Sequence, residues 1–167
     1  TPTTSPPRSS SSYATRTAAR DRGCMSEAVT RVLTPRTTGT AAWITTVVRV
    51  ATGVLFITFS LGKFVDHAQE SADFDHYGIP VPEVATYLVG TLELGCGALL
   101  VVGLFTRPAA LLLALNLLGA IATAGRVDGG TFHLGVAPAM LLAMLYLLWA
   151  GCGRLALDRR LASRPAT

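Results

Sequence analysis

Four long runs of apolar residues, separated by short polar segments, dominate the chain after residue 40. The runs cover about 41–61, 84–105, 108–124 and 132–150. Each run is close to the roughly 20 residues that an α-helix needs to cross the hydrocarbon core of a bilayer. Because the connections are too short for another layer of structure, the pattern predicts an all-α fold, an integral membrane four-helix bundle in residues 41–152. A soluble helical bundle is the alternative.

The composition supports lipid as the main surroundings of this bundle. Apolar residues make up 50% of the chain and charged residues 14%, and the mean hydropathy is +0.47. The net charge of +4 comes from arginines that flank the apolar runs, not from a clustered basic patch. We therefore expect the lipid bilayer, and no nucleic acid, as a partner.

Polar segments precede and follow the predicted bundle. Residues 1–40 are rich in Ser, Thr, Pro and Arg, a composition that cannot form a core and predicts a disordered tail. One hypothesis places the natural start at Met25, and a transit peptide is an alternative for the tail. Residues 153–167 form a short basic tail.

The basic residues predict the orientation of the bundle. Arginines are concentrated before the first run, between the second and third, and after the fourth: Arg8, Arg16, Arg20, Arg22, Arg31, Arg36, Arg107, Arg154, Arg159, Arg160 and Arg164. The other two connections contain only Lys63 and Arg126 as basic residues. Because positive loops stay in the cytoplasm, the N-terminus and the C-terminus are both predicted to be cytoplasmic.

Two ionisable residues and one amide lie inside the apolar runs. Arg49 is in the first run, Glu93 in the second and Asn116 in the third, at comparable predicted depths. A buried charge in a membrane needs a partner, and a guanidinium suits a carboxylate. We therefore predict an Arg49–Glu93 ion pair, joined by Asn116, as a buried polar cluster.

Residues three and four apart extend this cluster into an inward-facing polar seam. The seam consists of Thr45, Arg49, Thr52, Phe56, Ser60 and Lys63 in the first run and of Thr86, Gly90, Glu93 and Gly97 in the second. One interpretation is that the cluster only fixes the register of the helices. The alternative is a polar floor for a small ligand, such as a quinone head group, or a proton path.

Further polar residues fall on the predicted outer side. They are His67, His76, Asp66, Asp73 and Asp75, together with the candidates Lys63 and His133 at the ends of apolar runs. Their spacing matches no metal-ligand motif, so no metal site is predicted and a solvated loop is expected. His133, with Met140 and Met144 at helical spacing, is a candidate for an outer apolar pocket.

Several short motifs resemble one family. They are Gly62-Lys63, Gly78-Ile79-Pro80-Val81-Pro82, Glu93-Leu94-Gly95-Cys96-Gly97, Gly103-Leu104-Phe105-Thr106-Arg107 and the ending Gly151-Cys152-Gly153-Arg154-Leu155-Ala156-Leu157-Asp158. Their order and spacing over about residues 43–158 resemble the DoxX-like membrane proteins of bacteria. Two positions depart from the family pattern: Ala156 stands where Ser is usual, and His133 where many members have Glu.

The resemblance implies a multi-pass protein of the bacterial plasma (inner) membrane. It also implies a membrane subunit or anchor of a redox or oxidative-stress system, because the family is named after a subunit of a thiosulfate–quinone oxidoreductase. Quinone is the cofactor that this implies, and a soluble or membrane redox protein or a second copy of the chain is the expected partner.

Two other functions stay open at this stage. A small transporter or channel-like bundle would use the polar cluster to line a path, and a structural or assembly protein would use it only to hold the fold. No nucleotide-binding loop, catalytic nucleophile with a base, or haem motif is present. The chain is therefore not expected to be an enzyme on its own, although it is a candidate oxidoreductase subunit.

Overall fold

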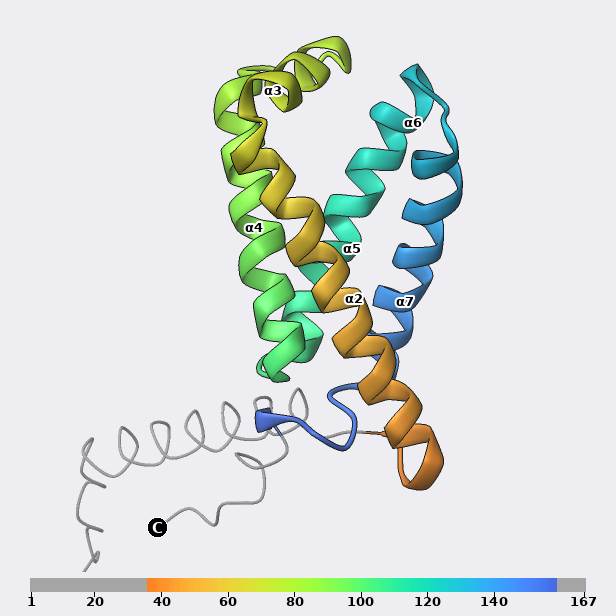
Figure 1. Ribbon diagram of the computed structural model, residues 1–167. Coiled ribbons are helices and arrows are strands. Elements are labelled where there is room, and N and C mark those ends of the chain that lie inside the picture. The colour runs from red at the N-terminus through yellow and green to blue at the C-terminus, as the bar shows by residue number, and fades with distance from the viewer. Residues whose placement is uncertain (1–35, 159–167) are drawn as a thin grey trace, which may run out of the picture. The chain divides into compact units, whose positions relative to one another are not determined.

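The computed structural model describes residues 36–158, and these residues are mainly helical (Figure 1). The elements in chain order are α2 (Gly39–Val65), α3 (His67–His76), α4 (Pro82–Val102), α5 (Thr106–Ala122), α6 (Ala124–Val127), the π-helix η1 (Phe132–Val136) and α7 (Ala137–Ala150). The predicted tail up to residue 35, including Met25, and the residues from 159 onward lie outside the described part.

Four helical stretches are long and apolar enough to cross a membrane, which confirms the predicted all-α membrane fold. They are Gly39–Val65, Pro82–Val102, Thr106–Val127 and Phe132–Ala150. The first helix begins two residues before the predicted run and continues four residues beyond its end. The third stretch is completed by α6, which follows α5 almost directly.

The helices place large apolar side chains outward and small or polar ones inward. Leu88 and Leu142 are 66% and 68% exposed, as expected of side chains that face lipid. The interior holds Phe56, Leu100 and Met144, together with alanines of α5 that let the helices approach closely. The predicted seam residues of α2 and α4 are buried apart from Lys63, so the seam faces inward as predicted.

Two helix pairs form the bundle: α2 packs along α4, and α5 packs along α7. The pairs diverge toward the end that carries α3 and α6 (Figure 1). Glycines set the register within the first pair. A Cβ on Gly53 would lie 2.9 Å from the carbonyl oxygen of Gly97, and a Cβ on Gly97 would lie 3.0 Å from that of Gly53. Only glycines allow this contact.

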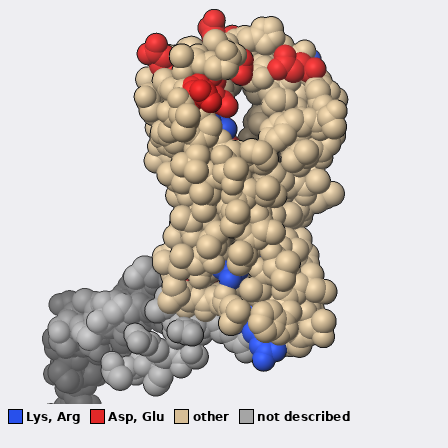
Figure 2. All heavy atoms as spheres, viewed as in Figure 1, with Lys and Arg blue, Asp and Glu red and all other residues tan. Residues whose placement is uncertain are grey.

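Most acidic side chains lie at one end of the described bundle, and Arg107 and Arg154 lie at the other (Figure 2). One end, here called the acidic end, holds the carboxylates of α3, Glu83 at the start of α4, and Asp128 after α6. The opposite end, here called the basic end, holds Arg107 at the start of α5 and Arg154 after α7.

The segment after α7 folds back and closes the basic end. The carboxylate of Asp158 accepts hydrogen bonds from the backbone N–H of Phe105 at 2.8 Å and of Thr106 at 3.0 Å. These bonds satisfy free N–H groups at the start of α5, where a negative charge is also favoured by the helix dipole. The backbone N–H of Arg154 donates to the hydroxyl of Thr46 at 2.9 Å, which ties the same segment to α2.

The segment after α2 differs from the expectation of a solvated loop. It forms α3, in which Ser71 is buried and the carboxylates of Glu70, Asp73 and Asp75 are half-buried or exposed. Its ten residues contain neither Gly nor Pro, and Ala, Gln and Glu favour a helix. High polarity thus led to the wrong prediction, because a short helix at a membrane surface needs only one partly apolar face.

Candidate functional site

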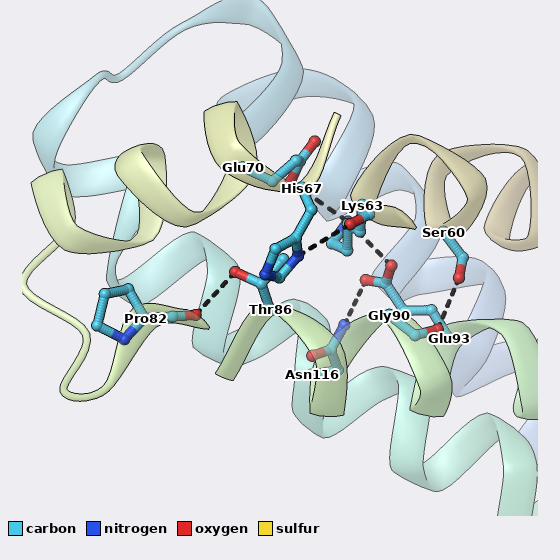
Figure 3. Close-up of polar contacts among 9 residues, drawn as sticks. All are labelled: Ser60, Lys63, His67, Glu70, Pro82, Thr86, Gly90, Glu93 and Asn116. Atoms are coloured by element: carbon cyan, nitrogen blue, oxygen red, sulfur yellow. Dashed lines mark hydrogen bonds and ion pairs between the residues drawn. The ribbon is translucent and has the colours of Figure 1, made fainter. Parts of the chain in front are cut away.

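Lys63, Glu93 and Asn116 form a polar cluster inside the bundle (Figure 3). Lys63 Nζ lies 3.1 Å from Glu93 Oε2, and Asn116 Nδ2 donates to Glu93 Oε1 at 2.8 Å. Glu93 is only 7% exposed. The cluster therefore joins α2, α4 and α5, and the predicted proximity of Glu93 and Asn116 is seen in the structure.

The predicted ion pair between Arg49 and Glu93 is wrong. The Arg49 guanidinium donates instead to the backbone carbonyls of Leu100 and Leu155, and to that of Val101 at 3.3 Å. These acceptors lie near the basic end, where Arg49 joins α2 to the end of α4 and to the segment after α7.

The register of α2 and α4 explains this difference. Gly53 faces Gly97, Arg49 lies four residues from Gly53 toward the basic end, and Glu93 lies four residues from Gly97 toward the acidic end. At 1.5 Å per residue, the two charged residues are about 12 Å apart along the helix axes. The guanidinium therefore reaches carbonyls at its own level before it can reach the carboxylate.

Lys63 is the cation that sequence reasoning did not assign to Glu93. Ser60 Oγ donates to the Gly90 carbonyl at 2.6 Å, which places Lys63 nearer the acidic end than Glu93 by about 9 Å of helix rise. Its side chain bends toward the interior, whereas a lysine at the end of a membrane helix usually extends toward water. The sequence did contain a signal for this contact, because Lys63 follows Ser60 and Phe56 at helical spacing and therefore lies on the same inward face of α2.

A cavity of about 570 Å³ opens beside this cluster, between the diverging helix pairs. Lys63, Glu93 and Asn116 are among the residues that line it. The aromatic side chains of Phe56, Phe59 and Phe132 and the side chain of Met140 form apolar walls. His133 lines the cavity as well, so both candidate outer-side residues, Lys63 and His133, lie at this site. Figure 2 shows the hollow between the two halves, with carboxylates near it.

Acidic residues surround the mouth of the cavity. Glu70 and Asp73 of α3 line it, and Glu70 Oε2 lies 4.0 Å from Lys63 Nζ. Tyr77 donates a hydrogen bond to Asp128 Oδ2 at 2.7 Å, which connects the residues after α3 with those after α6. Burial, and then the hydrogen bond to Asp128, raise the pKa of Tyr77 to about 12. Within residues 36–158, no three His, Cys, Asp or Glu side chains are grouped to hold a metal ion.

One family model and two curated relatives match this chain. The family model described as DoxX matches residues 44–126. A protein of Mycobacterium tuberculosis named "Uncharacterized membrane protein Rv3486" is 35% identical over 131 residues, which cover 70% of this chain and 80% of that protein. "Putative oxidoreductase CatD" of Bacillus subtilis is 32% identical over 114 residues, which cover 68% and 84%. No solved structure matches significantly. With four membrane-crossing helices and these relatives, the chain belongs to the DoxX family of membrane proteins.

Proposed function

We propose that this protein is a membrane subunit of a bacterial redox system and that its cavity binds the head group of a quinone. The observation that carries the proposal is the buried cluster of Lys63, Glu93 and Asn116 beside an aromatic-walled cavity. The similarity to a relative named as an oxidoreductase supports it. By the positive-inside rule, the basic end would face the cytoplasm and the cavity would open on the outer side of the inner membrane.

The residues present fit a quinone head group. The cavity volume of about 570 Å³ lies within the usual range for small-molecule sites, roughly 300–1,000 Å³. An ammonium has three N–H donors and an amide has two, so Lys63 and Asn116 each keep donors after binding Glu93. These donors suit a quinone carbonyl, and Phe59 and Phe132 offer apolar ring surfaces beside it. A bound quinone would supply two-electron, two-proton chemistry.

Glu93 holds the two donors of this cluster in place. Its Oε2 lies 3.1 Å from Lys63 Nζ, yet this oxygen has no well-directed hydrogen bond among the described residues. The contact is thus mainly electrostatic, and the carboxylate keeps Lys63 and Asn116 at the wall of the cavity.

The interior between the cavity and the basic end favours a binding site over a through-path. Leu100, Leu113, Met144 and Leu147 fill this region and are fully buried. A transporter would need these side chains to move apart, whereas a site that opens at one end needs no such movement.

Titration with a short-tailed quinone tests the proposal directly. We expect decylubiquinone to bind the purified protein in lipid nanodiscs. An Asn116→Leu change should weaken binding about tenfold, the equivalent of one hydrogen bond of roughly 1.4 kcal/mol. Thr58→Val is the matched control, because Thr58 is exposed and bonds only its own helix. Wild-type protein that is folded, binds no quinone and retains none from native membranes would disprove the proposal.

A further inference from the structure

The cavity also reaches the lipid-facing side of the bundle, between α4 and α5. Its lining includes Val89 of α4 and Leu115, Gly119 and Ala120 of α5. Leu115 is 58% exposed, and Gly119 is exposed as well, although both belong to an apolar membrane span. The cavity wall is therefore continuous with the surface that faces hydrocarbon.

The packing of α4 and α5 explains why the opening lies here. The two helices are joined at the basic end by Gly103–Phe105 and are tied together by the Glu93–Asn116 hydrogen bond. Beyond this bond they diverge toward the acidic end (Figure 1). Gly119 lies one turn beyond Asn116, and a Cβ placed on it would meet no atom within 4 Å. A small residue thus leaves space where the helices separate.

On the side of the cavity formed by α2 and η1, two aromatic rings pack against each other. There Phe59 of α2 and Phe132 of η1 meet edge to face, with ring centroids 5.2 Å apart. The mouth at the acidic end is polar and negatively charged, with Glu70 and Asp73 on its rim. The gap between α4 and α5, by contrast, is lined by apolar residues of membrane spans, among them the exposed Leu115 and Gly119.

We propose that the ligand of this cavity is a membrane-dissolved molecule with a compact polar head and a long apolar tail, and that its tail leaves between α4 and α5. The head would lie at Lys63 and Asn116, and the tail would run along Val89, Leu115 and Gly119 into the bilayer. This inference rests on the proposed function, because it takes the polar cluster as the site of the head group. It adds a place for the apolar tail and the route by which the ligand arrives.

Two quinones that share a head group and differ in the tail test this route. Decylubiquinone carries a ten-carbon tail, and ubiquinone-0 carries none. We expect Gly119→Trp in nanodiscs to weaken decylubiquinone binding about tenfold or more, a change of at least 1.4 kcal/mol. Binding of ubiquinone-0 should stay within about twofold, because the head-group contacts are intact.

Gly95→Trp is the matched control for this substitution. Gly95 is also exposed on a membrane helix, and a Cβ on it also meets no atom within 4 Å, but it does not line the cavity. It should leave the affinity for both quinones unchanged. Gly119→Leu provides a smaller obstruction with a weaker effect of the same kind, should the indole disturb folding.

The possible failures are distinguishable. If the wild-type protein binds both quinones and neither substitution at Gly119 weakens the tailed one selectively, the lateral route is wrong while the proposed function stands. The route is also wrong if Gly95→Trp has the same effect as Gly119→Trp. If folded wild-type protein binds neither quinone, the proposed function and the route both fail.

Discussion

A double-substitution cycle on Lys63 and Glu93 measures the ion pair at the centre of the site. Lys63→Met keeps the apolar stem and removes the charge, and Glu93→Gln keeps an acceptor for Asn116. Removing one member of a fully buried ion pair costs about 3–5 kcal/mol. The two side chains are 13% and 10% exposed, and they line a cavity, so the lower part of that range applies.

The two single changes are expected to differ. Lys63→Met leaves the Glu93 carboxylate with only the Asn116 amide, so we expect it to lower the free energy of unfolding by about 3 kcal/mol. Glu93→Gln should cost about 2 kcal/mol, because Lys63 can turn toward Glu70, now 4.0 Å away. The double substitution removes both charges and should cost about 2 kcal/mol in total. The coupling energy is then about 3 kcal/mol, at the upper end for contacting residues.

A second cycle on Arg49 and Glu93 is the matched control. These residues were the predicted pair, but the register separates them by about 12 Å along the helix axes. Residues that far apart, with no shared partner, usually have additive effects to within about 0.5 kcal/mol. Arg49→Met should itself be destabilising, since it leaves the carbonyls of Leu100 and Leu155 without their donor.

Reversible unfolding in mixed micelles, followed by far-UV circular dichroism as the denaturing detergent increases, gives the four free energies of each cycle. Strong coupling between Lys63 and Glu93, together with additive effects of Arg49 and Glu93, supports the structure. Additive effects of Lys63 and Glu93, together with strong coupling between Arg49 and Glu93, would refute the register of α2 and α4 described above. A stable Lys63→Met variant with an unchanged free energy of unfolding would show that the pair contributes nothing to the fold.

Three further predictions concern the ends and the helix contact. Asp158→Asn should lower stability by about 1–2 kcal/mol, because it weakens the cap of α5; an unchanged thermal midpoint would count against this role. Gly97→Ala should cost about 1–3 kcal/mol by thermal unfolding in detergent, since its Cβ would meet the carbonyl of Gly53, while Gly95→Ala should be neutral or slightly stabilising. The pKa of Tyr77 is raised from 10.0 to about 12, so its contribution to stability is complete below pH 10 and is lost as the pH rises to about 12. Tyr77→Phe should abolish this loss, and a slope that persists in the variant would disprove it.

The sequence alone determined the class of fold and the inward face of the helices. Four runs of membrane-crossing length admit few structures other than a helical bundle, because lipid leaves backbone groups no partner outside the helix. Polar and small residues at spacings of three and four predicted the buried seam. Glu93 and Asn116 were predicted to be neighbours because they lie at similar depths in the second and third apolar runs. Neither result needed knowledge of how the helices pack.

The tertiary structure decided which cation meets Glu93. The axial register of two antiparallel helices depends on which small residues meet, here Gly53 and Gly97, and a local pattern in one helix carries no information about that choice. A shift of two turns was enough to exchange Arg49 for Lys63 as the partner of the carboxylate. The cavity likewise arises only from the divergence of two helix pairs, because its walls belong to segments that are distant in the sequence. Periodicity fixes which face of a helix is buried, but only packing fixes what that face touches.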